Sequence, residues 1–360
     1  MSRSAREELL EVANKERDAH LRASLPPKEL SISDRMNEIS SRYCHTNRDT
    51  ELAAHLAAMK ASLLTSKEVD KDRQMLFLVG ESNAGKSTLI DKAIASDRSF
   101  FSFTSAEQER RRPLIRATGP SPFTLRNLSI RLLDACGYPV KSDSKESWVT
   151  PLVPDYFLKN RVCFVVIEEA QRTLKLDDKS EQQKVSDFFI GLTDSDLWPV
   201  RLIFVGVEPL DTLRDRDEQI WNRSKIMSLG AVPYASFDKV ADWAKQIITQ
   251  HAEMGCNDDL DLGETGKKLV HACDGNMGSM ITLIRSSIRE ALVADRNEVQ
   301  SVDFAQAYHA ATSCTPDENI FEQNTWQRIS SGLAKLDVVE EKLPASPKKM
   351  KPLKSGDRPR

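Results

Sequence analysis

Short apolar runs alternate with longer amphipathic stretches through the middle of the chain, from about residue 72 to residue 235. Nearly continuous runs of Val, Ile, Leu and Phe are typical of parallel strands that are covered on both faces, and the stretches between them have helical spacing. The alternation predicts an α/β fold, an αβα sandwich in which a parallel sheet lies between two layers of helices. The strands are expected at residues 75–79, 114–117, 162–167, 202–205 and 225–229.

The pattern changes on both sides of this central domain, residues 72–235. Residues 1–71 are predicted to form an N-terminal helical arm or docking segment, and its last apolar positions have the helical spacing that packs on a following domain: Leu52, Leu56, Met59, Leu63 and Leu64. Residues 236–315 are predicted to form a small helical lid domain with helices near 236–254, 262–273, 279–294 and 301–311. Residues 316–360 lose this periodicity and read as a disordered basic tail.

Composition narrows the class of protein only slightly. The 360 residues carry a net charge of −3, so any contact with nucleic acid must come from a local basic patch. Six cysteines lie scattered without metal-ligand spacing, which favours reduced thiols. No stretch approaches the roughly 20 apolar residues that cross a bilayer, and the polar start lacks the apolar core of a signal peptide. We therefore expect a cytoplasmic protein without a membrane partner.

The strongest chemical signal follows the first predicted strand. It has the spacing G-x-x-x-x-G-K-[ST], followed by Thr88, and consists of Gly80, Glu81, Ser82, Asn83, Ala84, Gly85, Lys86 and Ser87. Such a loop turns its backbone N–H groups around phosphates at the start of a helix, while the lysine reaches the terminal phosphates and the hydroxyl binds Mg²⁺. The pattern predicts a nucleotide site with Lys86 and Ser87 in these roles. A glycine-bearing surface turn that matches by chance is the alternative.

Two carboxylates follow the third predicted strand. Glu168 is placed to orient Mg²⁺, and Glu169 is placed to position the water that attacks the γ-phosphate. Acidic residues also follow strands in α/β proteins without this chemistry, so the interpretation depends on the phosphate loop upstream.

Arg223 stands at the end of a helical stretch, immediately before the last predicted strand. An arginine there can enter the active site of a neighbouring subunit and stabilise charge on the transferred phosphoryl group. A surface salt bridge is the simpler alternative.

These features together resemble the AAA+ ATPases, and more narrowly the TniB/TnsC family of transposon target-selection regulators. The matching residues run from about 73 to 294 and comprise GESNAGKSTLI, a proline-rich turn with its helix from Pro120 to Pro139, VVIEEAQRTL, the strand LIFVG, IWNRSKIMSLG and GNMGSMITLI. The phosphate loop is common to many nucleotidases, so the family resemblance depends on the remaining motifs and their order.

The resemblance implies an AAA+ module that binds ATP and Mg²⁺ between subunits and assembles as a homo-oligomeric ring or filament on duplex DNA. It also implies a transposase and a target-selecting adaptor protein as partners, in the bacterial cytosol and at the nucleoid when active. By this resemblance Lys86, Ser87, Glu168 and Glu169 form the catalytic and metal site and Arg223 is the arginine finger. Arg285, in the helix after the Gly275–Gly278 turn, would face the nucleotide as a second sensor.

Two positions depart from the family pattern. Relatives commonly have Asp-Glu where this chain has Glu168 and Glu169, and they tend to place a threonine where Val207 follows Gly206. The extra methylene changes the reach to the waters of Mg²⁺, and valine offers no hydrogen bond. We therefore predict slow, regulatory ATP hydrolysis.

The densest basic cluster of the predicted folded part surrounds the second strand and the helix after Pro122. It consists of Arg110, Arg111, Arg112, Arg116 and Arg126, with Arg131 beyond. Without aromatic residues among these arginines, sequence-independent binding to the phosphates of duplex DNA is expected rather than base stacking. A solvated turn balanced by Glu107 and Glu109 is the alternative. The tail adds a second basic group: Lys348, Lys349, Lys351, Lys354, Arg358 and Arg360.

Three hypotheses follow from the sequence. The first is an ATP-dependent, DNA-binding regulator of transposition that links target choice to the transposase. The second is an AAA+ or STAND-like signalling or defence ATPase that acts on protein partners without DNA. The third, a small-molecule kinase, shares the phosphate loop but does not explain a helical lid with an arginine placed for a neighbour.

Overall fold

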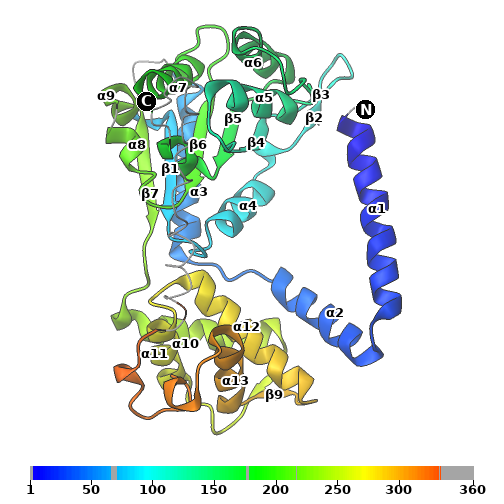
Figure 1. Cartoon of the computed structure of the whole chain (residues 1–360), viewed down its shortest axis with the longest axis vertical. Helices are drawn as coiled ribbons and strands as arrows, with labels where there is room; N and C mark the ends of the chain where they lie inside the picture. The colour runs from blue at the N-terminus through cyan, green and yellow to red at the C-terminus, as the bar shows by residue number, and fades with distance from the viewer. Residues whose placement is uncertain (1–2, 66–70, 176–177, 216, 332, 334–360) are drawn as a thin grey trace, which may run out of the picture.

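The fold is that of a computed structural model, which describes residues 3–65, 71–175, 178–215, 217–331 and 333. Figure 1 shows an upper part that contains the central sheet and a lower part made mainly of helices, with the helix α1 (Arg3–Ser24) standing apart from both. Within the described residues, no helix is long and apolar enough to cross a membrane.

Five parallel strands form the central sheet in the order β4-β5-β6-β1-β7. All six residues of β1 and all six of β6 are buried, as expected for strands covered on both faces. The five predicted strands are confirmed, with their ends shifted by at most two residues: β1 (Met75–Gly80), β4 (Leu114–Thr118), β5 (Phe164–Glu168), β6 (Arg201–Gly206) and β7 (Ser224–Leu229).

Helices cover both faces of this sheet because alternate residues of each strand point to opposite sides. Phe77 of β1 belongs to a core that also contains residues of α5, α6 and α7, whereas Leu76 and Leu78 pack with residues of α3 and α4. The helices of this part are α3 (Asn47–Ser62), α4 (Lys86–Ser96), α5 (Leu125–Ala135), α6 (Glu146–Asn160), α7 (Lys179–Thr193), α8 (Thr212–Asp215) and α9 (Glu218–Asn222). A short hairpin of β2 (Phe103–Thr104) and β3 (Arg110–Arg111) precedes β4.

The N-terminal helices belong to different parts of the molecule. Leu52, Leu56 and Met59 of α3 are buried against the sheet, as their spacing predicts, but Leu64 lies beyond the helix and is 90% exposed. In contrast, Ile39 of α2 (Pro27–Ser41) is buried in the core of the helical part. The chain therefore crosses from one part to the other between α2 and α3.

The helical part, here called the lid, is built from α10 (Phe237–Gln246), α11 (Leu262–Ala272), α12 (Met277–Val293) and α13 (Ser301–Thr312). A π-helical turn at Ile247–His251 extends α10. Two short strands that the sequence did not predict, β8 (Gly255–Cys256) and β9 (Glu298–Val299), pair in parallel. Gly275 has a φ of +72°, which glycine adopts readily, and it makes the turn between α11 and α12.

The segment after Pro316 differs from the expected disordered tail. Ile320, Phe321 and Trp326 are buried in the lid core, and the Trp326 indole Nε1 donates to Glu264 Oε1 at 2.7 Å. Single aromatic anchors in an irregular chain have no period, so the pattern did not reveal them. The basic residues Lys348, Lys349, Lys351, Lys354, Arg358 and Arg360 lie outside the described residues.

Candidate nucleotide site

The predicted phosphate loop connects β1 to α4. β1 ends at Gly80, and α4 begins at Lys86. Gly85 has a φ of +88°, a left-handed conformation that L side chains rarely adopt, while a Cβ at this position would meet nothing within 4 Å. Backbone conformation rather than space therefore requires glycine at the start of α4. The loop has the local geometry that a phosphate cradle needs.

Lys86 lies folded against this loop. Its Nζ donates to the carbonyl oxygens of Gly80 at 2.8 Å and Glu81 at 2.6 Å. Burial lowers the pKa of Lys86, and the negative charges of Glu169 and Glu81 act in the opposite direction. A partly desolvated ammonium group at this position attracts anions more strongly than an exposed one.

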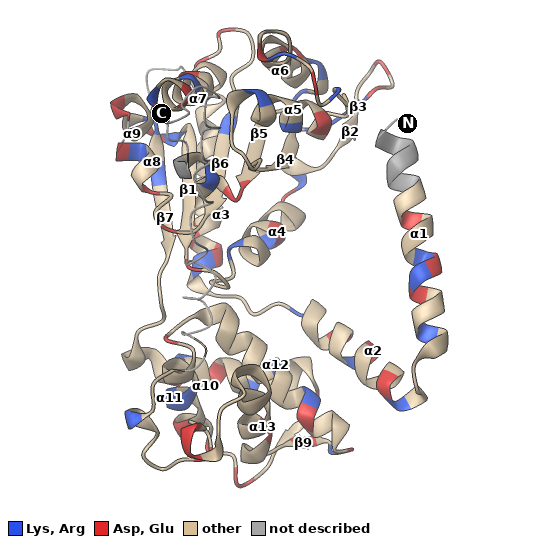
Figure 2. Cartoon of the chain, viewed as in Figure 1, with Lys and Arg blue, Asp and Glu red and all other residues tan. Residues whose placement is uncertain are grey.

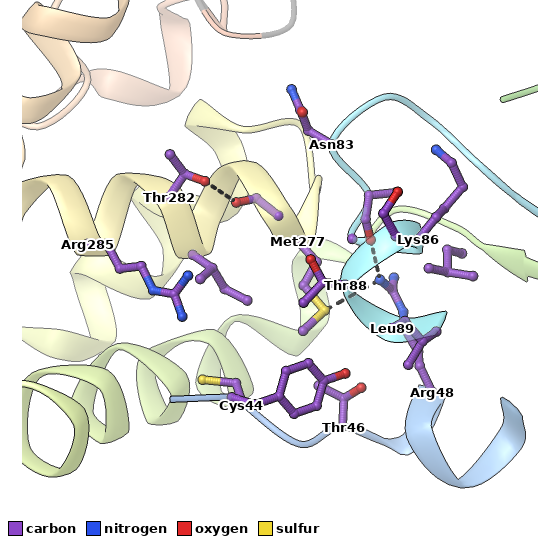
Figure 3. A pocket seen from close by; sticks show the side chains of 17 residues that line it. Cys44, Thr46, Arg48, Asn83, Lys86, Thr88, Leu89, Met277, Thr282 and Arg285 are labelled. Atoms are coloured by element: carbon purple, nitrogen blue, oxygen red, sulfur yellow. Dashed lines mark hydrogen bonds between the residues drawn. The ribbon is translucent and has the colours of Figure 1, made fainter. Parts of the chain in front are cut away.

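A cavity of about 330 Å³ lies beside the loop. Figure 3 shows that its walls come from the loop and α4, from the first turns of α12, and from the segment between α2 and α3. Of the predicted site residues, the cavity is lined by Asn83, Ala84, Gly85, Lys86, Ser87, Thr88 and Arg285. The structure thus brings the loop and the lid arginine to one cavity.

The lid touches the phosphate loop directly. Asn276 Nδ2 donates to the carbonyl oxygen of Ser82 at 2.7 Å. A Cβ on Gly278 would lie 1.9 Å from the carbonyl oxygen of Asn83, so only glycine permits this approach. The turn at Gly275–Gly278, which the sequence indicates only as a connection between two helices, therefore also brings α12 against the phosphate loop.

The segment that joins α2 to α3, together with the first turn of α3, supplies residues to which the sequence assigned no role. Tyr43, Cys44, Thr46 and Arg48 line the cavity. Arg48 donates to the carbonyl oxygens of Gly230 at 2.6 Å and Ala84 at 3.3 Å, and its Nη1 lies 3.4 Å from Met277 Sδ. In the sequence these residues coincide only with a short break between two helical patterns. Such a break does not indicate any particular chemistry.

Arg285 extends from α12 toward the cavity, near Cys44 (Figure 3). Its Nη2 donates to the carbonyl oxygen of Arg42 at 3.0 Å, whereas its buried Nε has no hydrogen-bond partner among the described residues. Burial lowers the pKa of Arg285. A buried donor without a partner is costly, so this guanidinium suits an additional acceptor in the cavity.

The two carboxylates lie at the end of β5, and each has its own partners. Arg116 of β4 pairs with Glu168 and with Asp91 of α4. Glu169 has a φ of +53°, and its Oε2 accepts from Gln171 Nε2 at 3.1 Å and lies 3.5 Å from Arg172 Nη2. Glu169 also interacts electrostatically with Lys86. The loop and the carboxylates therefore share the carboxyl-terminal edge of the sheet.

The arginines of the predicted DNA-binding cluster lie in different surroundings. Arg111 has a side chain 8% exposed and pairs with Glu107 at 2.8 Å and Glu109 at 2.6 Å. Arg126 donates to the carbonyl oxygen of Ser144 at 2.6 Å. Arg116 faces the candidate metal ligand, which argues against a DNA contact by this residue.

The remaining arginines of the cluster differ in exposure. Arg112 donates to the carbonyl oxygen of Ala135 at 3.4 Å, and Arg110 and Arg131 are exposed. Figure 2 shows basic and acidic residues interspersed over this part of the molecule. A DNA surface here would therefore depend mainly on Arg110 and Arg131.

Arg223 ends α9 and lies immediately before β7, as the sequence indicates. Its side chain is 17% exposed, and its guanidinium pairs with Asp194 at 2.7 Å and donates to the carbonyl oxygen of Gln219 at 3.1 Å. These contacts within one chain favour the salt-bridge alternative. Entry of Arg223 into a neighbouring site would require the pair with Asp194 to open.

Among the described residues, no group of three or more His, Cys, Asp and Glu side chains is arranged to hold a metal ion. Mg²⁺ is commonly held by one or two protein oxygens together with substrate phosphates. The hydroxyl of Ser87 and the carboxylate of Glu168 are such hard oxygen donors. The donor set therefore fits Mg²⁺ that arrives with a nucleotide.

Comparisons with solved structures give distant likenesses. An ORC2 protein from Aeropyrum pernix, described as ADPNP-ADP complexes, is 14% identical with a TM-score of 0.49, over 74% of this chain and 71% of that chain. Cdc6p from Pyrobaculum aerophilum is 12% identical with a TM-score of 0.47, over 70% of this chain and 65% of that chain. Neither TM-score reaches 0.5, so neither likeness informs function. No curated protein matches the chain.

A family model gives the decisive match. The model described as bacterial TniB protein matches residues 35–231, which include the α2–α3 segment, the phosphate loop and all five strands of the central sheet. The parallel sheet between helices and the lid that follows it also confirm the predicted AAA+ fold. The chain belongs to the family of bacterial TniB proteins.

Proposed function

We propose that this protein is an ATP-dependent regulator of DNA transposition. In this proposal it binds and slowly hydrolyses ATP, oligomerises on duplex DNA, and links a target-selecting adaptor protein to the transposase. The observation that carries the proposal is that Lys86, Ser87 and Arg285 line one cavity, in a chain of the TniB family. Phosphate-binding, metal-binding and lid groups around one cavity are what an ATP-dependent switch needs.

ATP fits the cavity by size and by chemistry. A volume of about 330 Å³ falls within the range of small-molecule sites. The N–H groups at the start of α4 and the ammonium group of Lys86 suit the phosphates. Tyr43 and Met277 offer aromatic and apolar surface to the base. When bound, Mg²⁺ would neutralise charge on the phosphate oxygens, with Ser87 and Glu168 as its protein ligands.

Glu169 is the residue that we assign to orient the attacking water. Its carboxylate is about half exposed and interacts electrostatically with Lys86, so it stands at the edge of the site where water can reach it. Glu168 must give up its ion pair with Arg116 before its carboxylate can coordinate Mg²⁺. This exchange, together with the apolar Val207 at the end of β6, supports slow hydrolysis suited to a timed assembly.

One specific observation favours a second candidate function. Arg111, Arg116 and Arg126 of the basic cluster are engaged by groups of the same chain. An ATPase that acts on protein partners in signalling or defence binds no DNA, so these arginines would need no role beyond their contacts within the chain. Both functions use the same nucleotide site. They differ in whether the ATP-bound protein assembles on DNA or acts on protein partners without DNA.

Sedimentation and electron microscopy of the full chain separate these functions. With ATP, Mg²⁺ and a duplex of unrelated sequence, we expect rings or filaments on the DNA. The Lys86→Ala chain should form none under the same conditions. ATP-dependent oligomers that form equally well without DNA and bind no duplex would favour the second function. An absence of any ATP-dependent assembly would contradict both.

A further inference from the structure

Gln171 joins the candidate water-orienting residue to the end of β6. It lies in the 3-10 helix Ala170–Lys175 that follows β5. Its Nε2 donates to Glu169 Oε2 at 3.1 Å, and its Oε1 accepts a long hydrogen bond, 3.4 Å, from the N–H of Val207. A carboxylate only accepts and a backbone N–H only donates, so one orientation of the amide satisfies both partners.

Gly206 makes room for this amide. A Cβ on Gly206 would lie 2.4 Å from Gln171 Oε1 and 3.2 Å from the Gln171 backbone nitrogen. Its φ is not positive, so a larger residue here is opposed by contacts and not by backbone conformation: the flexible end of Gln171 would have to shift, and Leu210 Cδ2 would lie 3.0 Å from the added Cβ.

Gln171 also compensates for a polar group that Val207 does not provide. Val207 follows the last residue of β6, and β6 is the neighbour of β5, whose last residue is Glu168. A branched apolar side chain at this position makes no hydrogen bond to a carboxylate or a water. Gln171 reaches the backbone N–H of Val207 from the connection that follows β5, and its amide carries both a donor and an acceptor.

Arg172 supports the same carboxylate from another direction. Its Nη2 lies 3.5 Å from Glu169 Oε2, and its Nη1 donates to the carbonyl oxygen of Gly119, after β4, at 2.7 Å. Glu169 is therefore tied to the end of β6 through Gln171 and to the end of β4 through Arg172. Two such restraints fix the direction of a half-exposed carboxylate better than one.

We propose that Gln171 is a positioning residue for ATP hydrolysis. It holds the Glu169 carboxylate in the orientation that accepts a proton from the attacking water, and it replaces the polar group absent at Val207. The inference rests on the proposed function, in which the chain hydrolyses ATP with Glu169 at the water. Gln171 acts through Glu169 and needs no contact with the nucleotide.

The test uses the full chain and the Gln171→Leu variant, which keeps the approximate size of the side chain and removes both hydrogen bonds. We expect kcat for ATP to fall about tenfold to a hundredfold, the effect of losing a hydrogen bond to a charged group. The Kd of a fluorescent ATP analogue should stay within about twofold, because the ground-state contacts remain. The matched control is Gln183→Leu at an exposed position of α7, where the amide donates to Asp187 Oδ1 at 2.8 Å, and its kcat should equal that of the parent.

Two further variants distinguish a specific loss of turnover from a folding defect of the Gln171→Leu chain. Gly206→Ala leaves Gln171 in place but displaces its amide, so kcat should fall while the Kd of the analogue is retained. Val207→Thr, added to Gln171→Leu, introduces a hydroxyl at the end of β6 and should restore part of the lost kcat.

Several results would overturn the inference. An unchanged kcat in Gln171→Leu would do so while leaving the ATPase proposal intact. An analogue Kd that weakens by the same factor as kcat falls would show that Gln171 merely shapes the binding site. Parent turnover no higher than that of Lys86→Ala would refute the proposed ATPase function itself, and the inference with it.

Discussion

The cavity has two walls that are made in different ways. One wall is contiguous in sequence: residues 83–89, which follow β1, turn at Gly85 and enter α4. The other is assembled from distant segments and includes Tyr43, Arg48, Met277 and Arg285. The first wall depends on local backbone conformation, whereas the second exists only after the lid has packed against the sheet. In the proposed function, phosphate binding therefore depends on local backbone geometry, and the response to the rest of the nucleotide depends on the tertiary fold.

Lys86→Ala should have the largest effect, because it removes the cation of the contiguous wall. We expect ATP affinity to fall about a hundredfold or more, the loss of charged hydrogen bonds to phosphate. Isothermal titration calorimetry measures it. Lys159→Ala, near the end of α6 and outside the cavity lining, is the control and should bind ATP like the parent. Equal affinities of the Lys86→Ala chain and the parent would remove the loop from the account.

Glu169→Gln comes next, and it acts on turnover rather than on binding. The amide cannot take a proton from water, so kcat should fall about a hundredfold or more. ATP affinity should be retained, and the ATP-bound assembly should persist. A radioactive phosphate-release assay measures turnover, and sedimentation measures the assembly. Turnover at the parent rate would show that another residue orients the water.

Arg285→Ala tests the assembled wall and should have a moderate effect. The variant removes a buried guanidinium at the cavity, and we expect ATP affinity to fall about tenfold, the value of one charged hydrogen bond. Arg289→Ala, one turn farther along α12 and exposed, is the matched control. If the Arg285→Ala and Arg289→Ala chains bind a fluorescent ATP analogue equally well, Arg285 does not contribute to nucleotide binding and the role given to the lid wall is wrong.

Arg116→Met should have the smallest effect, and its sign is informative. Arg116 pairs with Glu168, so it competes with a cation for this carboxylate. Its removal should lower the Mg²⁺ concentration at half-maximal ATPase activity by about threefold, the size of a modest charge interaction. DNA affinity should stay unchanged. A loss of DNA binding in the Arg116→Met chain would show that Arg116 contacts DNA after all.

The same contrast explains how much the sequence could predict. The strands could be read because a buried parallel strand is a continuous apolar run, and the loop could be read because Gly85 and Lys86 act through local geometry. The partners of Arg111, Glu107 and Glu109, lie within four residues of it and could be named from the sequence. The partners of Arg116 and Arg223 could not, because each of these two arginines pairs with a carboxylate that is distant in sequence and whose position depends on tertiary packing. Spacing identifies a charge but does not show which opposite charge the fold brings to it.

The central claim is that one nucleotide contacts both walls of the cavity. A structure of the chain with a non-hydrolysable ATP analogue and Mg²⁺ tests this claim most directly. We predict phosphates on the N–H groups at the start of α4 and beside Lys86, with the base between Tyr43 and Met277 and Arg285 in contact with the nucleotide. A nucleotide bound elsewhere, or one that contacts the loop but leaves Tyr43, Arg48 and the lid untouched, would contradict it.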